Sequence, residues 1–223
     1  MPPKTVQTPQ VKAMLAIPTR GYVWFETFKM SAHLEPIIYR EKLSVSNVRN
    51  RIVKDFLEDK HGHCDLLFMI DDDVIPPHKQ WAEVMADCPY DIVGAPVPMA
   101  KMPDMPVVLN AFDQDEDGNV VTAQVPDQGH LEVDQVGSGL IMIRRPVLEH
   151  PDMKAPFLQE LDEWGTIQVG QDIQFCRRAK KAGFTVGVAA EILCDHFVPL
   201  HLNTIPWVYG EPTGPGAPVA TAA

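Results

Sequence analysis

A run of five apolar residues that ends in three acids constrains this chain more than any other feature. Leu66–Ile70 leads directly into Asp71–Asp73, and the pair Pro76–Pro77 soon stops any extended strand, because proline donates no ladder hydrogen bond. An uninterrupted apolar strand is typical of a mainly parallel sheet covered on both faces. Ligands of such sheets bind beyond the carboxyl ends of the strands. We therefore expect the acids at a ligand-binding edge.

The rest of the core alternates strand-like apolar runs with helical spacings, which predicts an α/β fold with a mostly parallel, Rossmann-like sheet flanked by helices. A small antiparallel hairpin is predicted where Val107–Phe112 and Val120–Val125 flank an acidic turn. The predicted strands are Val11–Ile17, Pro36–Tyr39, Asp65–Ile70, Asp91–Val97, Gly139–Ile143 and Phe184–Ala190. Four helices are predicted. The first contains Tyr22 and Phe28, and the second runs from an N-cap at Ser46 to Leu57. The third contains Trp81 and Met85, and the fourth spans Gln168–Gly183.

The 223 residues divide into three zones by composition. Residues 1–10 are expected to be a flexible arm, residues 11–208 a single catalytic domain, and residues 209–223, rich in Pro, Gly and Ala, a disordered tail. No apolar run approaches the length of a membrane span, and the first residues lack the apolar core of a signal peptide. We therefore expect a cytoplasmic protein with no membrane span.

The net charge of −11, from 30 acidic and 19 basic residues, argues against a broad nucleic-acid-binding surface. The densest basic run, Arg177–Lys181, is expected to be the solvated face of a helix. The four cysteines form no CxxC pair, and they are too few for a disulfide scaffold, so reduced thiols are expected, with Cys176 and Cys194 buried in apolar stretches.

Three adjacent carboxylates at Asp71–Asp73 repel one another unless a cation lies among them. Oxygen ligands favour Mg²⁺ or Mn²⁺, which proteins hold through one or two carboxylates together with phosphate oxygens of a substrate. The alternative is a solvated acidic turn before the next helix. The buried strand that feeds the acids favours the metal.

Two other segments have partial metal-binding patterns. Asp113-x-Asp115-x-Asp117 begins like a calcium loop, but its twelfth position is Gln124 and its flanks are strand-like, so an acidic β-turn is the better interpretation. His61-x-His63-Cys64 lacks a second pair of ligands at zinc spacing, and a surface loop is favoured there.

A carboxylate in a first helical turn and a late histidine complete the candidates. Asp172, in Gly170-Gln171-Asp172, either stabilises the start of a helix or acts as a general base toward an attacking hydroxyl. His196 follows the last predicted strand, and it is either a third metal ligand or a loop residue. His201 is a weaker candidate of the same kind.

Taken in order, these residues resemble the GT-A-fold glycosyltransferases, especially the inverting, family-two-like branch. The resemblance covers roughly residues 12–201 and depends on the order and spacing of several short motifs. These are Ile17-Pro18-Thr19, Arg49-Asn50, Asp71-Asp72-Asp73 as a DXD motif, Gly137-Ser138-Gly139, Gly170-Gln171-Asp172 with Arg178 and Gly183-Phe184, and His196.

The resemblance implies a role for each matched position in the transfer of a sugar from a UDP- or GDP-sugar to an acceptor hydroxyl. The residues implied to bind the nucleotide sugar are Pro18, Thr19, Arg20, Arg49, Asp71 and Asp72. Asp73 and His196 are implied to bind the metal, and Asp172 is implied to be the catalytic base. The implied sugar or acceptor loop contains Trp164, Gly170 and Gln171. The family commonly has Glu directly before the base. Here that residue is Gln171, which removes one carboxylate from the acceptor side.

Two other functions stay open at this point. A nucleotidyltransferase also joins a Rossmann-like sheet to acidic metal ligands, but it would show a Gly- and basic-rich phosphate loop, of which Arg20-Gly21 is the only trace. A non-catalytic module that binds a sugar nucleotide or glycan would need no base at Asp172. Retaining chemistry and the nature of the acceptor are not decided by the sequence, although Trp164 and the Met99–Met105 segment are expected to be loops beside the site.

Overall fold

The computed structural model describes residues 11–19, 21–40, 44–99, 108–117 and 119–197. The predicted arm, the predicted tail, Arg20 and His201 lie outside the described residues, as does most of the Met99–Met105 segment. No described helix is both long enough and apolar enough to cross a membrane.

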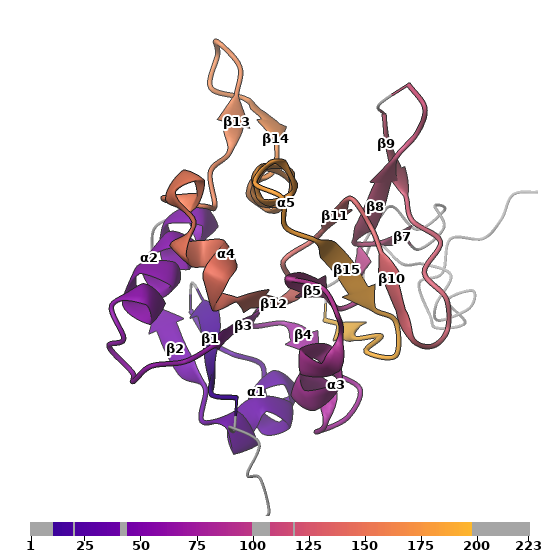
Figure 1. Cartoon of the computed structure of the whole chain (residues 1–223). Helices are drawn as coiled ribbons and strands as arrows, with labels where there is room; N and C mark the ends of the chain where they lie inside the picture. The colour runs from indigo at the N-terminus through magenta and orange to yellow at the C-terminus, as the bar shows by residue number, and fades with distance from the viewer. Residues whose placement is uncertain (1–10, 20, 41–43, 100–107, 118, 198–223) are drawn as a thin grey trace, which may run out of the picture.

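A seven-stranded mixed sheet forms the centre of the fold (Figure 1). Five strands point the same way and the other two, β12 and β10, run against them, so the predicted α/β fold with a mainly parallel sheet is confirmed. In spatial order the strands are β10 (His130–Glu132), β15 (Val186–Ala189), β5 (Ile92–Gly94), β12 (Leu140–Arg144), β3 (Leu66–Ile70), β1 (Ala13–Thr19) and β2 (Ile37–Arg40).

Helices cover both faces of this sheet, which explains why β3 is apolar at every position. Leu67 and Met69 pack into one core cluster, whereas Leu66, Phe68 and Ile70 pack into the other, because successive side chains of a strand point to opposite faces. The first cluster includes α2 (Val45–Leu57), α4 (Arg145–Glu149) and α5 (Gln171–Lys181), and the second includes α3 (Trp81–Asp87), with α1 (Phe25–Ser31) beside it (Figure 1).

Several small sheets and turns surround the central one. A three-stranded sheet, ordered β11-β8-β9, contains the predicted antiparallel hairpin. Its strands are β11 (Gln135–Val136), β8 (Ala111–Gln114) and β9 (Val120–Thr122). Three two-stranded sheets pair β13 (Glu160–Leu161) with β14 (Ile167–Val169), β16 (Asp195–His196) with β4 (Val74–Ile75), and β6 (Pro98–Met99) with β7 (Val108–Leu109). Two short 3₁₀ helices are η1 (Ala32–Leu34) and η2 (Pro151–Met153).

Some predicted boundaries were wrong for local reasons. Ser44, not Ser46, caps α2: its hydroxyl accepts a hydrogen bond from the Asn47 N–H at 3.4 Å, and Ser46 is buried within the first turn. Strand β1 continues through Pro18 to Thr19 because it pairs with β2 that far, and Pro18 is tolerated because the pairing with β3 already ends at Ala16. Helix α5 begins at Gln171 rather than Gln168, since the preceding residues pair with β13.

Candidate functional site

A cavity of about 690 Å³ opens where β3 ends. The antiparallel direction of β12 creates it, because the segment before β12 then meets the carboxyl end of β3, and the Asp71 N–H donates to the Gly139 carbonyl at 2.8 Å. This volume is in the usual range for small-molecule sites. The lining includes residues of α2, the end of β3, the segment before β12, the start of α5, and β16.

A smaller cavity of about 140 Å³ adjoins it and shares Asp71 as a wall. Pro18 and Thr19, at the end of β1, line this smaller cavity together with Asp72 and Asp73. The Thr19 hydroxyl donates to the Tyr22 carbonyl at 3.0 Å and accepts from the Gly21 N–H at 3.1 Å, which holds the turn after β1 in place. Five of the residues predicted to bind the nucleotide thus line these two adjoining cavities: Pro18, Thr19, Arg49, Asp71 and Asp72.

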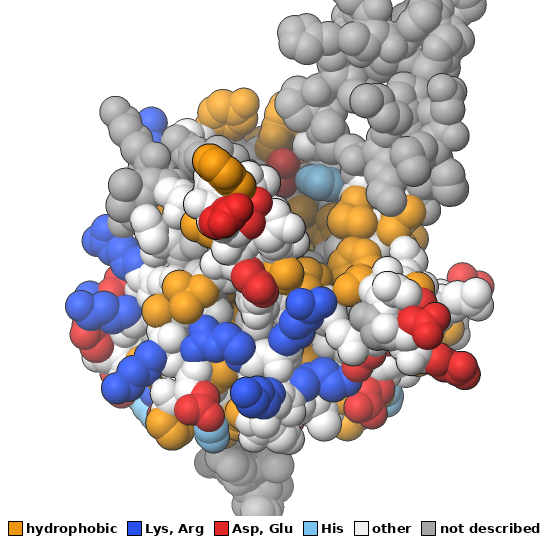
Figure 2. Space-filling model, turned by 90° about the horizontal axis from the view of Figure 1, so that it is seen from above, with side chains coloured by type: hydrophobic (Ala, Val, Ile, Leu, Met, Phe, Trp, Pro, Cys, Tyr) orange, Lys and Arg blue, Asp and Glu red, His pale blue; other side chains and the backbone are white. Residues whose placement is uncertain are grey.

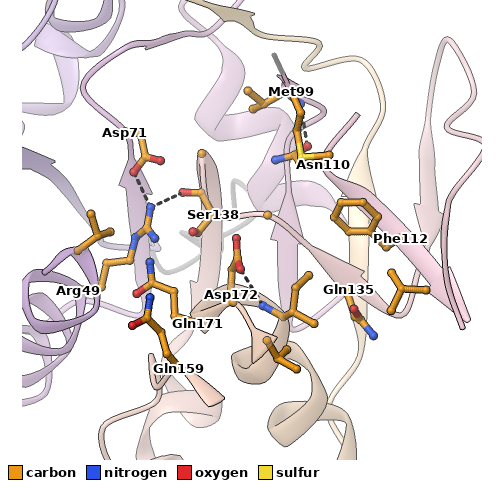
Figure 3. A pocket seen from close by; sticks show the side chains of 18 of the residues that line it. Arg49, Asp71, Met99, Asn110, Phe112, Gln135, Ser138, Gln159, Gln171 and Asp172 are labelled. Atoms are coloured by element: carbon orange, nitrogen blue, oxygen red, sulfur yellow. Dashed lines mark hydrogen bonds and ion pairs between the residues drawn. The ribbon is translucent and has the colours of Figure 1, made fainter. Parts of the chain in front are cut away.

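Arg49 and Asp71 form an ion pair at the junction of the two cavities. The guanidinium Nη2 lies 2.6 Å from Asp71 Oδ1 and also donates to the Ser138 carbonyl at 3.4 Å (Figure 3). The Arg49 side chain is 3% exposed and that of Asp71 is 33% exposed. Burial raises the pKa of the Asp71 carboxyl above its usual value. The Arg49 guanidinium lowers that pKa in part, and the negative charges of Asp73 and Asp72 raise it further. The Asp71 carboxylate is thus already paired with the positive charge of Arg49.

Asp73 and His196 face each other on neighbouring segments. Asp73 Oδ2 lies 3.6 Å from His196 Nε2, and His196 Nδ1 lies 2.7 Å from the Pro98 carbonyl oxygen. A carbonyl oxygen only accepts, so Nδ1 is the donor of that hydrogen bond, and Nε2 is the ring nitrogen that faces the Asp73 carboxylate. Metal-binding histidines commonly donate one ring N–H to a carbonyl in this way, which orients the other ring nitrogen toward the metal.

This pair tests whether a divalent cation fits the residues present. Across the described part of the chain, no group of three or more His, Cys, Asp or Glu side chains is placed to hold a metal by itself. Mg²⁺ and Mn²⁺ in nucleotide sites, however, need only one or two protein ligands, because phosphate oxygens and water supply the others. Asp73 and His196 fit that requirement, and they fit no site that depends on the protein alone.

Asp172 enters the larger cavity from the first turn of α5 (Figure 3). Gly170 is the N-cap residue, so Asp172 is not the cap, and its Oδ1 accepts the Ile173 N–H at 2.9 Å. That bond fixes one carboxylate oxygen against the backbone. Asp172 therefore lies in a fixed position on the cavity wall, as a general base requires.

Replacing Gly170 with alanine is expected to displace the Asp172 carboxylate without unfolding the protein. Its backbone conformation suits any residue, but an added Cβ would lie 3.0 Å from Asp172 Oδ1 and push the carboxylate aside. For Asp172 acting as the general base that the sequence suggests, we expect about a tenfold lower rate of hydrolysis of the predicted sugar-nucleotide donor, because small misplacements of a catalytic group are costly. Release of nucleoside diphosphate measures the rate, and nucleotide affinity and melting temperature are the controls. An unchanged rate would mean that the carboxylate position is unimportant.

The predicted sugar or acceptor loop is only partly at the cavity. Gly170 and Gln171 line it, and the Gln171 side chain lies beside those of Gln159 and Arg49 (Figure 3). Trp164 lies between β13 and β14, is 85% exposed, and lines neither cavity. Its position explains the exposure, because the hairpin projects from the body of the fold (Figure 1).

The sequence did not reveal the cavity wall formed by Asn110, Phe112 and Gln135 (Figure 3). The Asn110 side-chain oxygen accepts the Val97 N–H at 2.8 Å, and a Cβ on Gly137 would lie 2.8 Å from that of Asn110, so only glycine allows this approach. Gln135 stands between buried valines, Val133 and Val136. The available signal was the alternation of Leu131 and Val133 with acidic residues, which predicts an apolar residue at position 135, where the chain has glutamine.

The other sequence candidates have structural roles. Asp115 accepts the backbone N–H groups of Asp117 and Asn119 in the turn between β8 and β9, which agrees with an acidic β-turn. The four cysteines are free and buried. The basic run is not a purely solvated face, because Arg178 donates to four carbonyls of residues 152–156 and Lys180 pairs with Asp134. On the face shown in Figure 2, Lys and Arg side chains are mixed with Asp and Glu.

Comparison with known proteins supports the fold alone. No family model and no curated protein sequence matches the chain. Among solved structures, A197 from STIV superposes with a TM-score of 0.60 at 20% identity, over 85% of this chain and 87% of that one. GalNAc-T7, crystallised with UDP, GalNAc and Mn²⁺, superposes with a TM-score of 0.54 at 10% identity. The superposition covers 86% of this chain and 44% of the GalNAc-T7 chain. The chain therefore has an α/β fold that is GT-A-like by structural similarity.

Proposed function

We propose that this protein is a metal-dependent glycosyltransferase that moves a sugar from a UDP- or GDP-sugar to an acceptor hydroxyl with inversion at the anomeric carbon. The observation that carries the proposal is one cavity lined at the same time by Asp71, His196 and Asp172. The carboxyl end of β3 and the start of α5 each supply a carboxylate to it, and β16 supplies an imidazole. The GT-A-like fold, and a similar structure that holds UDP, GalNAc and Mn²⁺, agree with this function.

The donor is expected to lie across the two cavities. Pro18 and Thr19 would contact the base or ribose beside Asp71, and Arg49 would hold that carboxylate in place. Asp73 and His196 would hold Mn²⁺ or Mg²⁺ near the diphosphate. Such a cation, when bound, offsets the negative charge of the leaving diphosphate.

The chain's own part in the chemistry is a proton transfer at Asp172. Its carboxylate takes the proton of the acceptor hydroxyl as that oxygen forms a bond to the anomeric carbon. The bond from the anomeric carbon to the diphosphate oxygen breaks, and its electron pair leaves with the diphosphate. Water in place of the acceptor gives hydrolysis of the donor. Hydrolysis can therefore be assayed before the acceptor is known.

A thermal-shift screen of UDP, GDP and their sugars, with and without Mn²⁺, tests the donor site. We expect Mn²⁺-dependent stabilisation of the wild type, because a ligand that binds only the folded state raises its melting temperature. Asp73→Asn and His196→Ala should each lose that dependence on Mn²⁺. Asp195→Asn, an exposed neighbour of His196, is the matched control and should behave like the wild type. Failure of every nucleoside diphosphate to stabilise the wild type would contradict the proposal.

A further inference from the structure

The larger cavity has a second end, formed by the three-stranded sheet β11-β8-β9. Gln135 of β11 and Phe112 of β8 are register partners, so their side chains lie on the same face of that sheet. Both line the cavity, as does Val120 of β9. In Figure 3 Asp172 lies between this Phe112–Gln135 wall and the Arg49–Asp71 pair. The wall is therefore on the opposite side of the base from the expected nucleotide.

Gln135 is 1% exposed, and neither its Nε2 nor its Oε1 has a hydrogen-bond partner among the described residues. A buried polar group without a partner costs about 1–3 kcal/mol, so folded proteins usually satisfy such groups. Nε of Arg177, which lines the same cavity from α5, is also buried without a partner. Unsatisfied hydrogen-bonding capacity is thus present at this end of the cavity, in addition to Arg49 Nε and Gln171 Oε1 elsewhere on its lining.

We propose that the Phe112–Gln135 wall is the acceptor subsite and that it binds a neutral, hydroxyl-rich ring of monosaccharide size. An amide both donates and accepts, which suits hydroxyl groups, and the Nε–H of Arg177 adds a donor. The Phe112 ring and Val120 offer an apolar surface for the C–H face of a sugar. The role of the Phe112–Gln135 wall as an acceptor subsite rests on the proposed glycosyltransferase function, whereas the affinity of the wall for such a ring does not.

The binding test uses methyl glucopyranoside, methyl galactopyranoside and methyl mannopyranoside, with saturation-transfer NMR and titration on the full chain. We expect at least one glycoside to bind the wild type at millimolar concentration. Gln135→Met, which keeps the length of the side chain but removes its amide, should weaken that binding roughly tenfold. Phe112→Ala should weaken it as well. Gln124→Met, at an exposed glutamine outside the cavity, is the matched control and should bind like the wild type.

Thermal unfolding of each variant separates binding from folding. Methionine removes an unpaired buried amide, so Gln135→Met is expected to keep or raise the melting temperature. Binding of UDP and GDP with Mn²⁺ is measured in parallel and should be unchanged in all variants. If the wild type bound glycosides but no nucleotide, the glycosyltransferase proposal would fail and the sugar-binding wall would stand.

Three results would overturn the inference. The first is that no glycoside binds the wild type. The second is that Gln135→Met and Phe112→Ala bind the glycosides as tightly as the wild type does, which would mean that another group satisfies the amide. The third is that free nucleosides, tested as competitors, bind this wall while glycosides do not, which would identify a nucleobase as the acceptor.

Discussion

Replacing Asp172 with asparagine is expected to lower the rate of transfer, and of donor hydrolysis, about a hundredfold to ten-thousandfold, because a general base contributes that much to proton transfer. Asparagine keeps the size of the side chain and an oxygen that can accept the Ile173 N–H, so the cavity wall should stay in place. Nucleotide affinity, measured by calorimetry with Mn²⁺, should be unchanged. Loss of rate without loss of binding would distinguish an enzyme from a binding module.

The matched control is Asp127→Asn, at an exposed aspartate outside both cavities. It should keep the wild-type rate. Full activity of Asp172→Asn would show that the inverting mechanism is wrong. Once an acceptor is known, NMR of the product checks the stereochemistry, since direct attack opposite the diphosphate must invert the anomeric centre and retention would contradict it.

Replacing Arg49 with methionine should cost about 3 kcal/mol in the free energy of unfolding, because it leaves the Asp71 carboxylate without its cation. The value is at the low end for a broken buried pair, because the Asp71 side chain is 33% exposed and water screens it in part. Denaturant unfolding followed by circular dichroism measures the loss. The double variant Arg49→Met/Asp71→Asn should recover part of it, because the uncompensated charge is then gone.

Lys54 provides the comparison on the same helix. It pairs with Glu58 at 3.7 Å, and its side chain is 67% exposed. Lys54→Met should change the free energy of unfolding by less than about 1 kcal/mol, as exposed pairs contribute little. Equal effects of the two methionine variants would show that the Arg49–Asp71 pair contributes no more than a surface contact.

The parts of the fold and site that could be predicted from the sequence are contiguous in the chain. Strand β3 and the acids after it form one uninterrupted segment, so the pattern of burial and the place of Asp71 followed from local order. The start of α5 was placed within a few residues because Gly170 precedes an amphipathic segment. Ser44 and Ser46 could not be separated as caps by residue type, because both are serines and only the backbone geometry distinguishes them.

The Phe112–Gln135 wall could not be predicted, because it depends on pairing between segments whose register the sequence does not state. Phe112 and Gln135 meet only when β11 pairs with β8. The ion pair of Arg49 with Asp71 likewise joins a helix to a strand end across 22 positions. Proximity of this kind arises from tertiary packing. Local propensity and residue spacing do not predict which distant residues come into contact.

The separate three-stranded sheet has a consequence for how proteins of this architecture can diverge. The expected nucleotide contacts come from the ends of β1 and β3 and from α2, which belong to the central sheet and its covering helix. The opposite wall comes from β8, β9 and β11, which form a sheet of their own. Under the proposed function, insertions or replacements in that sheet would change which molecule receives the sugar while leaving the proposed donor site intact. In that case new acceptor preferences could arise in small evolutionary steps, without changes to the proposed donor site.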